Sequence, residues 1–290
     1  MLAAAALVAA APAFSQDDVV FRSAVSLVRV DVAVSDASGR VVEGLGKSDF
    51  RIFDEGQEQP IVNFSFETEP LDLILLFDTA GSMKGKLLQV VRAVELGFHE
   101  LRTGDRGCVM VFGSDTTELK AFTPDLGAVN EAIAIDVIGQ RFGGSSKIAA
   151  AADTAALRFR REPQTNRRRA VLIVTDKAAP HSPEEATAVR DLWQSDAVAS
   201  ELIIGKAPSQ SSDAIVEKTG GATVVAGDPG AAFQESVREL RRRYTLYYAL
   251  PAGSTAGAER AIKVALTPEA AGRFPGGRIH ARSGYVTPGR

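Results

Sequence analysis

The sequence predicts an α/β domain, with a largely parallel sheet and helices on both faces, inserted in a small antiparallel β domain made from both chain ends. Three observations lead to this prediction. An apolar run at 73–77 ends abruptly in Asp78, and a segment of helical spacing follows it. Between 71 and 230, strand-like and helix-like segments alternate, which is typical of βαβ units. On either side, 25–66 and 244–286 have the two-residue alternation and the tight turns of short strands.

The apolar run is the predicted centre of the sheet. A strand that is buried on both faces has no polar alternation, and 73–77 has none. Small residues, Thr79 to Ser82, form the turn after Asp78. Because ligands of open α/β sheets bind outside the carboxyl ends of the strands, these polar groups are candidate binding residues. The alternative is an ordinary strand-to-helix turn, in which Asp78 or Ser82 caps the next helix.

The period of the apolar residues gives the expected elements of this domain. Strands are expected at 72–78, 106–113, 117–122, 169–176, 198–204 and 222–226, and helices at 84–102, 126–136, 145–160, 183–195, 211–219 and 229–243. The first helix carries an apolar stripe made of Val90, Val91, Val94, Phe98 and Leu101.

The strands at the two ends of the chain pose a packing problem. Three are expected after the last helix, at 244–250, 260–266 and 278–286, and the turn at 251–259 indicates a hairpin between the first two. Neither these three nor the four strands expected near the N-terminus would make a sufficient core alone. We therefore expect the two ends to pack together into one β domain. The alternative is two unrelated extensions lying on the α/β sheet.

The composition is that of an ordinary globular protein. The chain has 290 residues, of which 45% are hydrophobic and 24% charged, with a net charge of −3. This balance argues against binding to nucleic acid or to an anionic membrane surface. Two basic clusters, Arg167–Arg169 and Arg241–Arg243, have no interleaved aromatic residues and are interpreted as solvated helix ends or loops.

The first residues of the chain have the pattern of a secretory signal peptide. Residues 1–16 are a short apolar block closed by small residues, without a basic start. The block is too short to span a membrane, and no other stretch reaches about 18 apolar residues. A disordered, alanine-rich tail is the alternative. We expect an exported protein, periplasmic, envelope-associated or secreted, and its single Cys108 in a predicted strand suits that environment.

Three segments of the α/β region resemble the von Willebrand factor type A (vWA) domain, which has a Rossmann-like fold. The sequence D-T-A-G-S-M at 78–83 resembles the D-x-S-x-S motif of that family. The sequence G-G-S at 143–145 resembles its G-G-T element, and V-L-I-V-T-D at 171–176 resembles its next strand with an acidic end. The segments occur in the family's order and cover about 70 to 230.

The resemblance extends to a bacterial secreted VWFA-related family of the acidobacterial type. It is carried by the strands from Val28 to Gly56, by K-T-G-G at 218–221, by R-R-R-Y-T-L-Y-Y-A-L-P at 241–251 and by R-S-G-Y at 282–285. The expected domains are a signal peptide at 1–16, an N-terminal β segment at 17–69, the vWA domain at 70–230, and a linking helix with a C-terminal β segment at 231–290.

The vWA resemblance implies a metal-ion-dependent adhesion site at the carboxyl end of the sheet. In that pattern Ser82 and Ser145 would ligate Mg²⁺ directly, and Asp78 and Asp176 would hold it directly or through waters. Mg²⁺ prefers oxygen ligands in octahedral geometry and keeps several waters. A carboxylate of a protein partner would complete the coordination. Ala80 occupies the position of another hydroxyl ligand and supplies no oxygen.

The departures from the family's pattern predict a weakened site. Besides Ala80, Lys177 follows Asp176, and Lys147 stands two residues after Ser145. An ammonium about 4 Å from a carboxylate is worth ~4 kcal/mol at an effective dielectric of 20, and it repels a divalent cation. We therefore expect a lysine to replace the ion in part. The alternative is purely structural, with the acidic and hydroxyl residues capping helices and loops.

Catalysis is not predicted. The three histidines, His99, His181 and His280, are scattered, and the sequence has no nucleophilic triad, zinc-ligand spacing or P-loop. We expect a non-catalytic protein–protein interaction module for adhesion or scaffolding. One alternative is a metal-independent scaffold with a vestigial site. A weaker alternative is a metal-dependent hydrolase that uses Asp78 and Asp176, for which no general base is evident.

Overall fold

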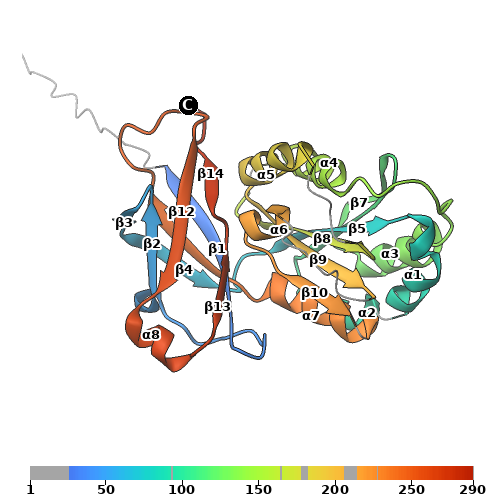
Figure 1. Cartoon of the computed structure of the whole chain (residues 1–290), viewed down its shortest axis with the longest axis horizontal. Helices are drawn as coiled ribbons and strands as arrows, with labels where there is room; N and C mark the ends of the chain where they lie inside the picture. The colour runs from blue at the N-terminus through green and yellow to red at the C-terminus, as the bar shows by residue number, and fades with distance from the viewer. Residues whose placement is uncertain are drawn as a thin grey trace, which may run out of the picture.

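The computed structural model describes residues 26–92, 94–163, 165–177, 182–205, 214–226 and 228–289. The described chain forms two parts that lie side by side (Figure 1). One is a six-stranded sheet between helices, and the other is a pair of four-stranded sheets. The predicted signal peptide, 1–16, lies outside the described residues.

The six-stranded sheet is parallel apart from one edge. Its strand order is β10-β9-β8-β5-β6-β7, and β7 runs antiparallel to β6. The strands are β5 (Leu71–Asp78), β6 (Arg106–Phe112), β7 (Thr116–Thr123), β8 (Arg168–Thr175), β9 (Ala197–Ile204) and β10 (Thr223–Ala226). Every residue of β5 is buried, because the strand is central and helices cover both of its faces.

Helices cover the two faces of this sheet in two groups. On one face pack η2 (Gly81–Met83), α1 (Lys84–Val91), α2 (Val94–Phe98), α3 (Leu126–Glu131), the π-helical η3 (Ala132–Val137) and α7 (Pro229–Arg241). On the other pack α4 (Ile148–Arg160), α5 (Glu184–Gln194) and α6 (Ala214–Thr219). Since side chains alternate along a strand, Leu73 and Leu75 join the first core, and Ile74 and Leu76 join the second.

The helix predicted at 84–102 is two shorter helices, α1 and α2. Its apolar stripe still faces the core, because Val90, Val94 and Phe98 all belong to the first core. Helix α2 approaches α7 closely at Gly97, where a Cβ atom would lie 2.5 Å from ring carbons of Phe233. The lack of a side chain at Gly97 therefore permits this helix contact.

The second part of the molecule is built from both ends of the chain. One sheet has the order β13-β1-β11-β4 and the other β14-β12-β2-β3, and a short 3₁₀ turn, η1 (Lys47–Asp49), precedes β2. The strands are β1 (Leu27–Ser35), β2 (Phe50–Asp54), β3 (Gln57–Gln59), β4 (Ile61–Phe66), β11 (Tyr244–Ala249), β12 (Glu259–Leu266), β13 (Arg278–Ala281) and β14 (Gly284–Val286). Strand β1 lies between β11 and β13, and β2 lies between β12 and β3. The predicted fold class, with a β domain made from both ends, is confirmed.

Two details predicted for the C-terminal strands are wrong. Strands β11 and β12 do not form a hairpin, because β1 and β4 already pair with the two edges of β11. The segment 278–286 is two strands, β13 and β14, that belong to different sheets. A short helix, α8 (Pro268–Arg273), stands where no element was expected. The hydroxyl of Thr267 caps it by accepting from the N–H of Ala270, and a proline occupies its first turn.

One carboxylate joins strands from both chain ends in the core of the β domain. Asp54, the last residue of β2, is buried and accepts hydrogen bonds from the hydroxyls of Tyr248 (2.7 Å) and Tyr285 (2.8 Å). Arg260 of β12 lies 2.6 Å from its other oxygen. Burial and the hydrogen bond to Asp54 raise the pKa of Tyr285 to about 12. Four strands, β2, β11, β12 and β14, are thus linked through a single side chain.

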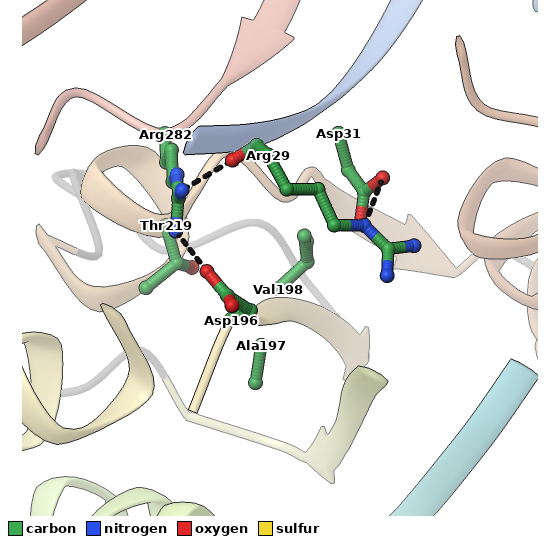
Figure 2. A pocket seen from close by; sticks show the side chains of 7 residues that line it. All are labelled: Arg29, Asp31, Asp196, Ala197, Val198, Thr219 and Arg282. Atoms are coloured by element: carbon green, nitrogen blue, oxygen red, sulfur yellow. Dashed lines mark hydrogen bonds and ion pairs between the residues drawn. The ribbon is translucent and has the colours of Figure 1, made fainter. Parts of the chain in front are cut away.

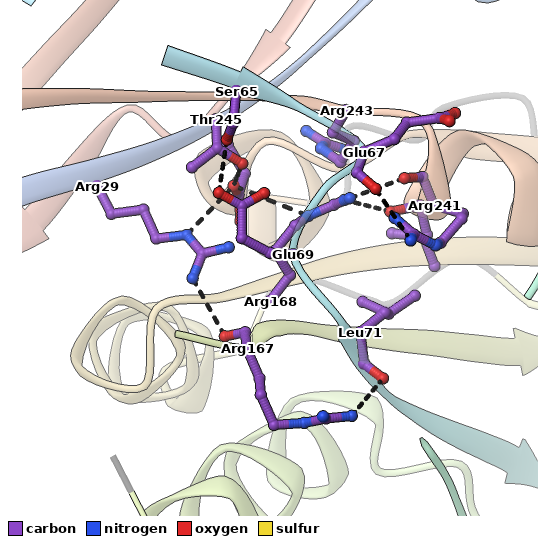
Figure 3. A network of polar contacts seen from close by, with 12 residues as sticks. Arg29, Ser65, Glu67, Glu69, Leu71, Arg167, Arg168, Arg241, Arg243 and Thr245 are labelled. Atoms are coloured by element: carbon purple, nitrogen blue, oxygen red, sulfur yellow. Dashed lines mark hydrogen bonds and ion pairs between the residues drawn. The ribbon is translucent and has the colours of Figure 1, made fainter. Parts of the chain in front are cut away.

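The interface between the two parts is rich in arginine, so the interpretation of the basic clusters as solvated is wrong. Arg168 is 2%, Arg241 3% and Arg243 0% exposed. Arg168 donates to the carbonyl oxygens of Arg241 (2.7 Å) and Leu240, which are the last carbonyls of α7 (Figure 3). A positive group at that position also offsets the partial negative charge of the helix end. Arg243 pairs with Glu239 at 2.6 Å.

Arg282 and Arg29 extend this interface (Figure 2). Arg282, between β13 and β14, donates to the carboxylate of Asp196 at 2.7 Å and to the carbonyl oxygen of Arg29. Arg29 in β1 lies 3.4 Å from Asp31, which also accepts from the hydroxyl of Thr245 at 2.8 Å. Because charge-assisted hydrogen bonds are directional, these contacts define how the two parts meet.

Candidate functional site

The carboxyl ends of β5, β6 and β8 bring three loops to one edge of the six-stranded sheet. These strands are parallel neighbours, with Asp78 opposite Phe112 and Phe77 opposite Val174. The loops that follow them therefore start side by side. In open α/β sheets this edge is the one where ligands bind.

Asp78 is completely buried at this edge, and both of its carboxylate oxygens are engaged. Oδ1 accepts from the backbone N–H of Ala80 at 2.8 Å, and Oδ2 accepts from the hydroxyl of Thr175 at 2.7 Å. Neither Asp78 nor Ser82 caps α1, whose N-cap residue is Met83 without a side-chain bond. Helix capping, the structural alternative for these two residues, is therefore wrong.

Backbone hydrogen bonds hold the loop that carries Ser145 against the other two. The N–H of Gly143 donates to the carbonyl oxygen of Thr79 at 2.9 Å, and the N–H of Lys147 donates to that of Gly113 at 3.3 Å. Ser145 is exposed, and its hydroxyl forms no hydrogen bond within the described chain. It does not cap α4, whose N-cap residue is Lys147. The hydroxyl of Ser145 thus stays available at the rim of the site.

Asp176 follows β8 and meets a lysine from α1. Its Oδ2 lies 2.6 Å from Nζ of Lys86, and its Oδ1 is buried without a hydrogen-bond partner in the described chain. Burial disfavours the charged form of Asp176, but contacts with Lys86 and with the hydroxyl of Ser82 outweigh this effect and lower its pKa. The charge of Lys177 acts in the same direction. Asp176 is therefore ionised, and its partner is a cation of the protein itself.

The lysine at the site is Lys86, and not Lys177 or Lys147 as the sequence predicted. Lys86 stands four positions after Ser82, so the two residues lie on the same side of the chain as it enters α1. That spacing is the signal in the sequence that points to it. Lys177, although adjacent to Asp176 in sequence, influences it through charge and not through a hydrogen bond.

The donors at this edge belong to the class that Mg²⁺ prefers. Asp78, Asp176, Ser82 and Ser145 offer carboxylate and hydroxyl oxygens, and Oδ1 of Asp176 is a buried oxygen without a partner. The ammonium of Lys86 competes for the same carboxylate. Within the described residues there is no group of three or more His, Cys, Asp or Glu that could hold a metal. The donors at this edge are thus of a type that Mg²⁺ binds, whereas the hydrogen bonds of Asp78 and the ion pair of Asp176 with Lys86 oppose a bound ion.

A comparison with sequence families identifies the α/β part. Residues 73–178 match the family described as the von Willebrand factor type A domain. The chain contains a vWA domain. Its six-stranded sheet with helices on both faces is the Rossmann-like arrangement predicted for that domain. Membership of the secreted bacterial VWFA-related family stays a prediction. No curated protein matches the chain significantly.

Solved structures with a similar fold include a vWA protein. A von Willebrand factor type A protein from Catenulispora acidiphila has 12% identity and a TM-score of 0.50, covering 92% of this chain and 76% of that one. Manganese-loaded TRAP from Plasmodium vivax has 16% identity and a TM-score of 0.50, covering 76% and 98%. Proximal thread matrix protein 1 from the mussel byssus has 12% identity and a TM-score of 0.51, covering 61% and 49%. Because these identities are low, the likeness concerns the fold alone.

The histidines that the structure describes lie away from this edge. His99 follows the end of α2, and His280 belongs to β13 of the β domain. His181 lies outside the described residues. No helix in the described part of the chain is long and apolar enough to cross a membrane.

Proposed function

We propose that this protein is an exported, non-catalytic interaction module, for adhesion or scaffolding, that binds a protein partner at the carboxyl end of the vWA sheet. The observation that supports this most directly is the ion pair between Lys86 and Asp176 within a cluster of oxygen donors. The site would be a degenerate metal-ion-dependent adhesion site, with Ser82, Ser145, Asp78 and Asp176 as the residues that hold Mg²⁺. The bound ion would supply a coordination position for an acidic side chain of the partner.

Lys86 limits the affinity of this site for a divalent ion. Two unit charges about 4 Å apart interact by ~4 kcal/mol at an effective dielectric of 20, so the ammonium opposes the ion by a comparable amount unless it moves. The side chain of Lys86 is 38% exposed and can turn into solvent, with loss of its bond to Asp176. An acidic partner therefore meets positive charge in either state, from the ion or from Lys86.

A metal-independent scaffold is the second candidate function. Ala80 supplies a methyl group where the family's pattern has a hydroxyl ligand, and both oxygens of Asp78 already accept hydrogen bonds. In that case the sheet-end site is vestigial and other surfaces carry the contacts. A metal-dependent hydrolase is the weakest candidate, because both carboxylates are engaged and the described residues of the site include no free general base.

Titration calorimetry with Mg²⁺ and Mn²⁺ tests the role of Lys86. The unmodified protein should bind with a millimolar or weaker dissociation constant, and Lys86→Met should bind at least about tenfold more tightly, equivalent to ~1.4 kcal/mol. Lys84→Met is the matched control, since Lys84 is an exposed lysine of the same helix. Micromolar binding by the unmodified protein that disappears in Asp78→Ala would refute the weakened site.

A pull-down from the native envelope fraction, with and without EDTA, separates the two candidate functions. An adhesion site predicts a partner whose capture falls with EDTA and in the Asp176→Ala variant. A scaffold predicts capture that is indifferent to both. Turnover of a substrate that depends on Asp78 and Asp176 would instead support the hydrolase.

A further inference from the structure

A cleft of about 580 Å³ lies between the two parts of the molecule. One wall is the end of β1 with the turn after it, 33–41, and the other is β10. Glu235 and Glu239 of α7, with Arg278 and His280 of β13, complete the lining. No residue of the sheet-end site belongs to it. Clefts between domains are common binding places for ligands.

Strand β10 is the outermost strand of the vWA sheet on this side (Figure 1). The N–H of Glu201 in β9 donates to the carbonyl oxygen of Ala222 at 3.0 Å, so the even-numbered residues of this strand pair with β9. The N–H and C=O groups of Thr223 and Val225 consequently point away from the sheet. Both residues are exposed, Val225 by 42%, and both line the cleft. The cleft thus contains an open strand edge.

Arg278 is the charge in this cleft that lacks a counter-charge. The acidic residues of the lining each have an arginine of their own: Asp36 with Arg40 at 3.1 Å, Glu235 with Arg238 at 2.7 Å, and Glu239 with Arg243 at 2.6 Å. Arg278 is exposed and has no ion-pair partner within the described chain. The cleft therefore favours a ligand with a negative group.

His280 adds a hydrogen-bond acceptor beside Arg278. Its Nδ1 lies 3.1 Å from the carbonyl oxygen of Gly221, which can only accept, so Nδ1 is the nitrogen that carries the proton. Burial lowers the pKa of His280, which favours the neutral ring. In the neutral ring Nε2 is an acceptor, and it can pair with a backbone N–H of a bound chain.

We propose that an extended segment of a partner protein binds in this cleft as an added strand beside β10, with an acidic side chain paired to Arg278. The main chain of the segment would pair with Thr223 and Val225, whose outward groups have the spacing that a strand partner needs. An acidic side chain fits because Arg278 is the lining charge that the described chain leaves unpaired. This binding mode needs no metal ion and does not rest on the function proposed for the sheet-end site.

Selection of peptides on the full-length protein tests the proposal. A phage-displayed library of random peptides, each about twelve residues long, should yield strand-forming sequences with Asp or Glu at a shared position. With a synthetic copy of a selected peptide, Arg278→Gln should weaken binding about two- to fivefold. Changing the acidic residue of the peptide to its amide should have a similar effect, and the two changes together should cost little more than either alone.

Val225→Pro tests the strand pairing itself. Proline removes the outward N–H of Val225 and leaves the pairing with β9 intact, and edge strands tolerate it. Binding of the selected peptide should fall at least about tenfold, whereas Val225→Thr, which keeps the N–H, should bind normally. Circular dichroism checks that the variants are folded. If Val225→Pro does not fold, a peptide methylated on alternate backbone nitrogens makes the same test.

Several results would overturn the proposal. Selected peptides without a shared acidic position would exclude the role of Arg278, and equal binding to Val225→Pro would exclude strand addition. Sedimentation that shows two copies of this chain joined through β10, and separated by Val225→Pro, would assign the edge to self-association. Asp176→Ala should leave peptide binding unchanged, which separates this cleft from the sheet-end site.

Discussion

Replacing Asp54 by asparagine should strongly destabilise the β domain. The change removes the charge that pairs with Arg260 at 2.6 Å and leaves one amide oxygen for two tyrosine hydroxyls. Hydrogen bonds to a charged group contribute ~1.5–3 kcal/mol each, and breaking a buried ion pair from one side costs ~3–5 kcal/mol. Because the side chain of Arg260 is 22% exposed and recovers some hydration, we expect a loss near the lower end, ~3 kcal/mol.

Thermal unfolding followed by far-ultraviolet circular dichroism measures this effect. For a chain of this size 1 kcal/mol corresponds to ~2–4 °C, so the midpoint should fall by ~6–12 °C. The single tryptophan of the chain gives a second signal. Trp193 of α5 donates to the carbonyl oxygen of Lys218 at 3.0 Å and lies against Gly284 of β14, so its emission reports where the two parts meet.

Glu58→Gln is the matched control for Asp54→Asn. It breaks an ion pair with Arg51 on the same sheet, but the two side chains are 49% and 42% exposed, so water replaces the lost contact. The control should leave the midpoint almost unchanged. If Asp54→Asn lowers the midpoint no more than Glu58→Gln, the buried carboxylate does not hold the four strands together, and the reasoning is wrong.

Three further predictions concern packing, ionisation and reactivity. Gly97→Ala should destabilise the protein by ~1–3 kcal/mol in urea unfolding, because the new Cβ would lie 2.5 Å from the ring of Phe233. Gly85→Ala, whose new Cβ would have no atom within 4 Å, should stabilise the protein by ~0.5–1 kcal/mol. Burial and a hydrogen bond to a second aspartate raise the pKa of Asp153 from 3.8 to about 6, so the folded state loses stability relative to the unfolded state as the pH rises through this range. Asp153→Asn should therefore raise the free energy of unfolding above about pH 7, by less than ~1 kcal/mol after solvent screening, and leave it unchanged below about pH 4. Equal effects at both pH values would contradict this. Burial raises the pKa of the Cys108 thiol to about 12. A thiol reagent at about pH 8 should therefore label Cys108 only in denaturant, and rapid labelling of the folded protein would contradict the burial of Cys108 in β6.

The vWA sheet could be predicted because its apolar residues have clear periods. The run at 73–77 lacks polar alternation, and the whole of β5 is in fact buried. The stripe from Val90 to Phe98 predicted the face of α1 and α2 that meets the core, although it could not reveal the break between them. An apolar stripe keeps the same period on both sides of such a break, so periodicity alone does not detect it.

Features that depend on neighbours distant in sequence could not be predicted in the same way. Arg168 and Arg243 resemble solvated charges until the fold brings the carbonyl oxygens of α7 and the carboxylate of Glu239 to them. The turn at 251–259 indicates a hairpin, but a hairpin forms only where the first strand has a free edge, and β11 has none.

The sequence indicated which strand ends meet at the candidate site but not the contacts within it. The strand ends after β5 and β8 placed Asp78 and Asp176 at one edge of the sheet, and a hydroxyl, that of Thr175, was the unforeseen partner of Asp78. Sequence adjacency favoured Lys177 as the competing cation, whereas helical spacing from Ser82 places Lys86 there.

The interleaving of the two chain ends bears on how the protein is synthesised. Strand β1 pairs with β11 and β13, so this valine-rich segment has no strand partner until residues 244–281 have been synthesised. The vWA sheet can form in the meantime, and it brings Glu67 and Arg243 to adjoining positions, which shortens the loop that the ends must close. Truncated products would keep an unpaired, aggregation-prone strand, and chaperones or proteases would encounter that species first.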